Sequence, residues 1–317
     1  MSIVLEFIIF LVSMIVLDVS SDLMIKASVK ISELTYIGEL SLGFILLSII
    51  TILPEFTMSM MAISSGGSEI AIGTILGALV THICLILGLV SIKEPLDVSE
   101  NTLRRLLLIL SVIAFIIALL ILVPVPGKII GYVLVLFFIF FVYHNVKNET
   151  RFNLIKKKNT KETFLNTGKN IFLIFSGFIL VLISARFTIN SGIKIARMLK
   201  INEFFIGSTL IALGSSVPEL AITWSAMKKG KENLAVGNII GSSFMGMTLI
   251  LGLILILSSN NVNLVSSIEL ILFVSGSTIL LWIFLGNIGR KRLDRFEGSV
   301  LLFLYILFIL RILTKIY

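Results

Sequence analysis

The chain has 317 residues, of which 57% are hydrophobic and only 14% charged, and its mean hydropathy is +1.10. So much apolar surface excludes a soluble domain built around one core, and we expect a membrane protein in contact with the lipid bilayer. The net charge of +8 does not indicate a nucleic-acid partner, because Lys and Arg cluster in the polar connections between apolar runs.

Apolar runs long enough to cross a bilayer follow one another along the whole chain. A transmembrane helix needs about 20 apolar residues. Ten runs meet this length, centred near residues 11, 48, 81, 113, 136, 180, 214, 245, 275 and 306. The sequence therefore predicts an all-α polytopic membrane protein with ten transmembrane helices, five before the basic segment 147–169 and five after it.

The first apolar run carries two carboxylates, Glu6 and Asp18, and has no basic leader. A cleaved signal peptide begins with a basic region, so we expect this run to be retained as a membrane span.

The distribution of Lys and Arg predicts the orientation in the membrane. The cations gather in alternate connections, and the connections between them are nearly free of cations. By the positive-inside rule the basic side is cytoplasmic, which places both termini outside the cell in a plasma-membrane protein. Three cations after the sixth span would lie near the outer face, and we interpret them as side chains that reach from a helix end to the interface: Lys194, Arg197 and Lys200.

One segment of the chain occurs twice. Residues 43–89 align without a gap on residues 207–253, at a constant offset of 164, and 15 of the 47 paired positions are identical. The repeated unit has five predicted spans, and an odd number of spans forces the second copy to insert upside down. We therefore expect two inverted five-helix repeats, 1–146 and 170–317, joined by a basic cytoplasmic linker at 147–169.

A proline and a glutamate recur in the second span of each repeat. Pro54 and Pro218 should break these helices near the middle of the membrane and free carbonyls about one turn earlier, and Glu55 and Glu219 follow directly. A lone proline is usually only a kink, but a glutamate in the membrane is costly and suggests function. Oxygen clusters with two carboxylates suit hard cations such as Ca²⁺ or Na⁺.

The third span of each repeat carries small and polar residues that could complete such a site. Gly73-x-x-x-Gly77 and Gly237-x-x-x-Gly241 allow helices to approach closely, although this motif is common in packing alone. Asn238 and Ser242 add polar groups to the second of these spans.

The residues from Gly207 to Leu220, with Gly237-Asn238-Ile239-Ile240-Gly241-Ser242, resemble the second alpha-repeat of the sodium/calcium exchangers in the cation/calcium antiporter superfamily. The resemblance implies a secondary antiporter that exchanges Ca²⁺ against Na⁺ by alternating access. It implies Glu55 and Glu219 as central calcium ligands, with the main-chain carbonyls of Thr51 and Ser215. The other expected ligand positions, mainly for Na⁺, are Ser48, Ala212, Ser216, Asn238 and Ser242.

The chain departs from that pattern at several neutral polar positions. Ile52 stands where the family has a serine, Ala78 replaces a second serine, and His82 and Gly246 stand where it places Asn or Asp. Sodium depends on several weak oxygen ligands, so this loss should weaken sodium sites more than a site built on two carboxylates. The coupling ion is then either a smaller number of sodium ions or protons.

His82 has two interpretations. Protons could be carried by the glutamates or by His82, since the unperturbed pKa of histidine lies near 6.5. Equally, His82 could be a packed, hydrogen-bonded residue, and we include it among the candidate ligands.

Other classes of protein agree less well with the sequence than the antiporter does. The loss of ligands leaves open a non-transporting paralogue of the same fold, although such a protein would have little reason to keep both Pro-Glu pairs. No channel filter is visible, and no nucleophile is paired with a base, so we expect no enzyme. The single cysteine, Cys84, and the lack of a phosphate-binding loop indicate no redox chemistry, cofactor or nucleotide.

Overall fold

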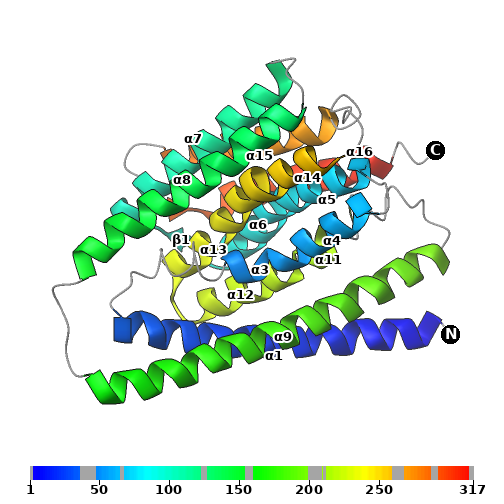
Figure 1. Ribbon diagram of the computed structural model, residues 1–317. Coiled ribbons are helices and arrows are strands. Elements are labelled where there is room, and N and C mark those ends of the chain that lie inside the picture. Colours follow the sequence, from blue (N-terminus) through cyan, green and yellow to red (C-terminus); the bar gives the residue numbers. More distant parts are fainter. Residues whose placement is uncertain are drawn as a thin grey trace.

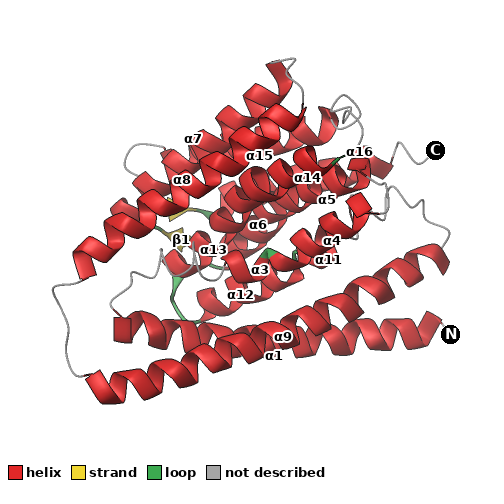
Figure 2. Ribbon diagram, viewed as in Figure 1, coloured by secondary structure: helices red, strands yellow, loops and turns green. Residues whose placement is uncertain are grey.

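The computed structural model describes residues 3–35, 48–64, 68–122, 127–153, 160–198, 209, 212–258, 268–286 and 292–313. This part of the chain is almost entirely helical (Figure 2). Gly43, Gly207 and Lys200 of the predicted pattern lie outside it.

Two long helices form one side of the molecule. These helices, α1 (Ile3–Thr35) and α9 (Thr160–Met198), lie side by side and run in opposite directions (Figure 1). Their 33 and 39 residues correspond to about 50 and 59 Å at 1.5 Å per residue, well over the thickness of the hydrocarbon core. The sequence underestimated both lengths, because helices continue past the apolar run into polar residues.

The predicted breaks at the prolines are confirmed. α3 (Ser48–Thr51) is separated from α4 (Leu53–Ser64) by the single turn residue Ile52, and α11 (Ala212–Ser215) from α12 (Val217–Lys228) by Ser216. Each proline is the second residue of its new helix and offers no N–H to the residue four positions earlier.

The next helices contain a wider turn at matching places. α5 (Ser68–Val80), η2 (Thr81–Ile86) and α6 (Leu87–Lys93) form one rod, as do α13 (Glu232–Met245), η4 (Gly246–Ile250) and α14 (Leu251–Leu257). The segments η2 and η4 are π-helical, a feature often found at functional sites.

The offset of 164 recurs in the bounds of these elements. It relates the bounds of α3 to α11, of α4 to α12 and of α6 to α14, and the first residue of α5 to that of α13. The two copies therefore share their local structure as well as their sequence. The inverted orientation of all five helices stays a prediction, which the antiparallel pair of α1 and α9 favours.

Four further helices cover the rods. α7 (Glu100–Leu122) packs on α15 (Ile268–Gly286), α8 (Gly127–Asn153) on α14, and α16 (Arg295–Leu313) on α6. The contact of α8 with α14 is very close, since a Cβ at Gly131 would lie 2.6 Å from the carbonyl oxygen of Gly252. Gly88 of α6 approaches Gly298 of α16 in the same way.

Strands were not expected, and one short pair is present. β1 (Leu96–Asp97) and β2 (Arg292–Leu293) are antiparallel, with Leu96 opposite Leu293. Each lies in a short connection just before a helix, where the backbone groups of the two connections can satisfy one another. Apart from this pair the described residues are nearly all helical, in agreement with the all-α expectation.

Two charged segments have more structure than the sequence indicated. Most of the basic linker 147–169 is helical, because α8 continues to Asn153 and α9 begins at Thr160; residues 154–159 lie outside the described part. Lys194 does not act only as an interfacial cation, since its Nζ lies 2.9 Å from Oε1 of the buried Glu6. This ion pair joins the beginning of α1 to the end of α9.

Among the described residues, three helical stretches are long and apolar enough to cross a membrane: Ala71–Lys93, Glu232–Leu257 and Glu269–Gly286. Shorter apolar stretches lie at Ile3–Ser13, Gly127–Tyr143 and Gly168–Ser184. The total of ten spans therefore stays a prediction.

Candidate cation-binding site

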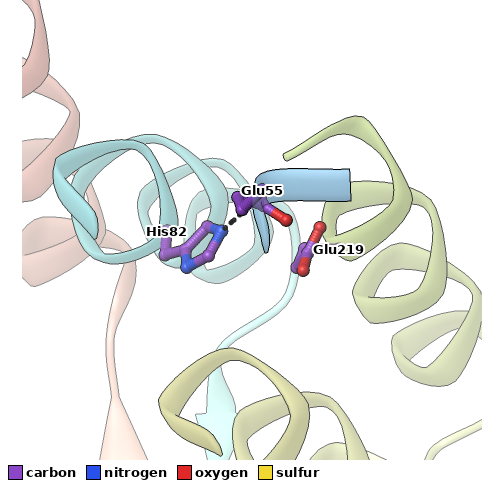
Figure 3. A group of neighbouring side chains, drawn as sticks. All are labelled: Glu55, His82 and Glu219. Atoms are coloured by element: carbon purple, nitrogen blue, oxygen red, sulfur yellow. Dashed lines mark ion pairs between the residues drawn. The ribbon is translucent and has the colours of Figure 1, made fainter. Parts of the chain in front are cut away.

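Two buried carboxylates meet between the repeats. Glu55 and Glu219 lie in the first turns of α4 and α12, and both side chains are completely buried. Together with His82 of η2 they form a group whose nearest ligand atoms all lie within 4.8 Å of one another (Figure 3). A helix N-terminus favours negative charge, so both helices help to stabilise these carboxylates.

Most of the carboxylate oxygens have no partner among the described residues. The hydroxyl of Ser216 lies 3.4 Å from Oε1 of Glu55 and has one hydrogen to share between this oxygen and the nearer carbonyl of Ala212, whereas Oε2 of Glu55 and both oxygens of Glu219 have no hydrogen bond to the described residues. A buried charge without a partner is costly, and two such carboxylates side by side repel each other. A bound cation would relieve both costs.

His82 completes the group from the first repeat. Its Nε2 lies 3.7 Å from Oε1 of Glu55, and its Nδ1 lies 3.5 Å from the hydroxyl of Ser243. The side chain is 2% exposed. His82 is thus a packed, hydrogen-bonded residue whose ring also faces the carboxylates, and its role as a ligand stays a prediction.

The polar residues predicted on α3 and α13 are brought together. The hydroxyl of Thr51 lies 3.1 Å from that of Ser242 and 3.5 Å from Oδ1 of Asn238. Ser48 donates to the main-chain carbonyl of Asn238 at 3.0 Å. All four side chains are completely buried, so they form a buried polar contact.

The corresponding residues on α11 bond mainly within their own helix. Ser215 and Ser216 donate to the carbonyl of Ala212 at 3.1 and 2.8 Å, and the amide of Ser216 donates there as well. This carbonyl would have to exchange one of these bonds to bind an ion. The carbonyls of Thr51 and Ser215 stay predicted ligands.

Apolar packing replaces the missing polar groups. Ile52 and Ala78 are buried, and a Cβ at Gly246 would lie 3.1 Å from Cδ1 of Ile75 and 3.8 Å from Cδ1 of Ile52. The side chains of Ile52 and Ile75 thus occupy the space that a carboxylate at position 246 would need. Two of the departures from the family pattern, Ile52 and Gly246, fit each other because they lie in the same packed region.

Two further hydroxyls were missed in the sequence. Ser59 and Thr223 lie one turn after Glu55 and Glu219; both are completely buried and make no hydrogen bond to the described residues. Other buried hydroxyls, such as that of Thr248, bond to the carbonyl four residues earlier. The offset of 164 pairs Ser59 with Thr223, a signal that could have identified them.

The chain is similar to known proteins over most of its length. The family model described as sodium/calcium exchanger protein matches residues 5–147 and 169–314. An uncharacterized membrane protein of Methanocaldococcus jannaschii is 30% identical over 94% of this chain and 95% of its own length. The sodium/calcium exchanger MaX1 of Methanosarcina acetivorans is 26% identical over 96% and 97%.

The fold matches a solved exchanger. The structure of the sodium-calcium exchanger NCX_Mj soaked with Na⁺ and no Ca²⁺ superposes with a TM-score of 0.82 at 27% identity. The match covers 96% of this chain and 98% of that one.

Proposed function

The chain belongs to the sodium/calcium exchanger protein family and is a multi-pass membrane protein, and from this premise we propose that it exchanges a divalent cation against Na⁺, with Ca²⁺ as the ion to be tested first. The observation that carries the proposal is the pair of buried carboxylates Glu55 and Glu219, three of whose oxygens lack a partner among the described residues. Two carboxylates can neutralise one divalent ion.

Exchange follows from competition for the same oxygens. If the divalent ion and the sodium ions both need Glu55 and Glu219, they cannot be bound together. The protein then returns across the membrane only with one load or the other, which couples the two fluxes.

Alternating access requires that the site be exposed to each side in turn. The ten spans would form two inverted repeats with the site between them, in the plasma membrane and with both termini outside. The α1–α9 pair is the moving element in this proposal: α1 packs extensively on α12, whereas α9 makes a much smaller contact with α4. This unequal packing suits a state closed on one side of the site.

Proton coupling is the second candidate. It is favoured by the apolar replacement of sodium positions around Ile52 and by His82, whose Nε2 lies 3.7 Å from Glu55. Protons need no shell of neutral oxygens, so they could compete with a divalent ion at the same carboxylates.

The test is ⁴⁵Ca²⁺ uptake into liposomes containing the purified protein. An outward sodium gradient should drive uptake, and Glu55→Gln and Glu219→Gln should each reduce it to background. Glu100→Gln is a matched control, because this carboxylate is 54% exposed and lies at the surface, where it pairs with Arg104. Its loss should leave uptake unchanged, as expected of a surface ion pair.

A pH gradient without sodium separates the candidates. Uptake driven only by the pH gradient would identify protons, and not sodium, as the coupling ion. No uptake of any divalent cation under either gradient would contradict the antiporter and favour a non-transporting paralogue.

A further inference from the structure

The imidazole of His82 is held in one orientation by Ser243. The hydroxyl of Ser243 donates its hydrogen to the carbonyl of Ile239 at 2.8 Å, so towards Nδ1 of His82, 3.5 Å away, it can only accept. The contact is satisfied when Nδ1 carries the hydrogen. In a neutral imidazole this leaves Nε2 with its lone pair free.

That lone pair faces acceptors. Nε2 has no hydrogen-bond partner among the described residues, and its nearest charged neighbour is Oε1 of Glu55. A lone pair beside two carboxylates is unfavourable unless a metal ion or a proton lies between them. A histidine that binds a metal through one ring nitrogen usually donates a hydrogen bond from its other ring nitrogen to a fixed acceptor, as Nδ1 of His82 does to Ser243 when it carries the hydrogen.

The distance between His82 and Glu55 fits two ligands of one ion. The 3.7 Å between Nε2 and Oε1 of Glu55 exceeds a hydrogen bond. Two ligands each about 2.0–2.2 Å from a tetrahedral metal lie roughly 3.3–3.6 Å apart, close to this value. The nearest ligand atoms of Glu55, His82 and Glu219 all lie within 4.8 Å of one another (Figure 3).

The same position argues against a site optimised for calcium. Ca²⁺ takes six to eight oxygen ligands, whereas imidazole suits first-row transition metals. The site has gained a nitrogen at His82 and lost oxygen-bearing positions at Ile52, Ala78 and Gly246, where apolar atoms now pack. Fewer oxygens and one nitrogen favour a smaller ion of lower coordination number.

We propose that Glu55, Glu219 and His82 bind a divalent transition-metal ion, of the class of Mn²⁺, Co²⁺ and Zn²⁺, in preference to Ca²⁺. If the protein is the antiporter proposed above, this metal is the ion that it exchanges; that part of the inference rests on the proposed function. Ser243 is a positioning residue in this arrangement, since it acts through the histidine.

Binding to the purified full-length protein tests the preference. Titration with Zn²⁺, Mn²⁺ and Ca²⁺ separately should show the transition metals binding at least about tenfold more tightly than Ca²⁺. His82→Asn should weaken Zn²⁺ about 10- to 100-fold while changing Ca²⁺ little. The matched control is His144→Asn on α8, the second histidine of the chain, which should change neither.

Stronger binding of Ca²⁺ than of Zn²⁺ and Mn²⁺ by the unaltered protein would overturn the inference. So would unchanged Zn²⁺ affinity in His82→Asn. Retained Ca²⁺ binding by that variant shows that it is folded.

X-ray absorption at the zinc edge gives a second readout that does not depend on the stability of a variant at position 82. Zinc bound to His144→Asn protein should show the scattering of one imidazole, because His82 is then the only histidine left. Absence of imidazole scattering from bound zinc would contradict the assignment.

Transport separates this inference from the proposed function. Sodium- or proton-driven uptake of Ca²⁺ without any uptake of Mn²⁺ or Zn²⁺ would leave the antiporter in place and overturn the metal preference. Binding of zinc that depends on His82, without uptake of any divalent ion under either gradient, would support the metal site and contradict the antiporter.

Discussion

Two helix crossings related by the internal repeat differ in chemistry. Where α3 crosses α13, Ser48 and Thr51 bond to Asn238 and Ser242. Where α11 crosses α5, Ser215 turns its hydroxyl to the Ala212 carbonyl of its own helix.

The second crossing has also lost polar groups. Ala78 stands where the first crossing has Ser242, and Ala212 stands where it has Ser48. One backbone plan thus carries a polar crossing and a less polar one, which we call the apolar crossing. The apolar crossing keeps the buried hydroxyls of Thr74 and Ser215 but has fewer neutral oxygens for a sodium ion, whereas the carboxylates are kept on both sides. We therefore expect fewer sodium ions per cycle than a symmetric site would hold.

A substitution that disrupts the polar crossing should have the largest effect on sodium affinity. Thr51→Val deletes the hydroxyl shared by Ser242 and Asn238, leaving buried groups unpaired at a cost of about 1–3 kcal/mol. We expect the sodium concentration for half-maximal uptake to rise about tenfold, which corresponds to about 1.4 kcal/mol.

Ser215→Ala is the matched change at the apolar crossing. Its hydroxyl bonds within its own helix, so the sodium concentration for half-maximal uptake should rise clearly less than in Thr51→Val. Equal effects of the two variants would show that the crossings are equivalent and would break the comparison.

Filling the apolar region should cost stability. Gly246→Ala places a Cβ 3.1 Å from Ile75, and overpacking of a tight core typically costs about 1–3 kcal/mol. The thermal unfolding temperature in detergent should fall, and Ile75→Ala in the same chain should restore part of the loss. The control is Gly276→Ala on α15, where a Cβ would meet nothing within 4 Å. An unchanged unfolding temperature for Gly246→Ala would contradict the packing described here.

Restoring one hydroxyl at the apolar crossing should make the two crossings more alike. Ala78→Ser makes α5 resemble α13 at Ser242, and the sodium affinity measured by uptake should increase a few-fold, by less than Thr51→Val reduces it. A hydrogen bond is worth about 1 kcal/mol, or about fivefold. A decrease in sodium affinity would indicate that the apolar crossing is needed as it stands.

The unpartnered hydroxyls should have the smallest effect on transport and a distinctive effect on stability. Removing Ser59 or Thr223 by Ser59→Ala or Thr223→Val deletes a buried group without a partner, so the unfolding temperature should stay the same or rise. Uptake should fall a few-fold if these hydroxyls help an ion to reach the glutamates. A lower unfolding temperature with unchanged uptake would assign them to packing alone.

Much of the fold could be predicted because the repeat is strict. The offset of 164, the prolines and the glutamates predicted the broken helices and the meeting of Glu55 with Glu219, which the structure shows. The length of α1 and α9 and the strand pair could not be predicted, because hydropathy does not detect polar helix ends or backbone pairing between distant connections.

The details of the site were less accessible to the sequence. His82 was ambiguous, since only its contact with Glu55 and the bond with Ser243 decide which way the ring faces. The apolar contact of Gly246 with Ile75 was invisible for the same reason: it joins the two repeats and depends on how their helices cross.

The central claim is that Glu55 and Glu219 together bind the exchanged cations. The most direct measurement is sodium-driven ⁴⁵Ca²⁺ uptake, repeated with the transition metals, in liposomes containing the unaltered protein, Glu55→Gln, Glu219→Gln or Glu100→Gln. The account predicts uptake of a divalent ion that is abolished by either buried substitution and unaffected by the exposed one. Uptake that survives the loss of either buried carboxylate would contradict it.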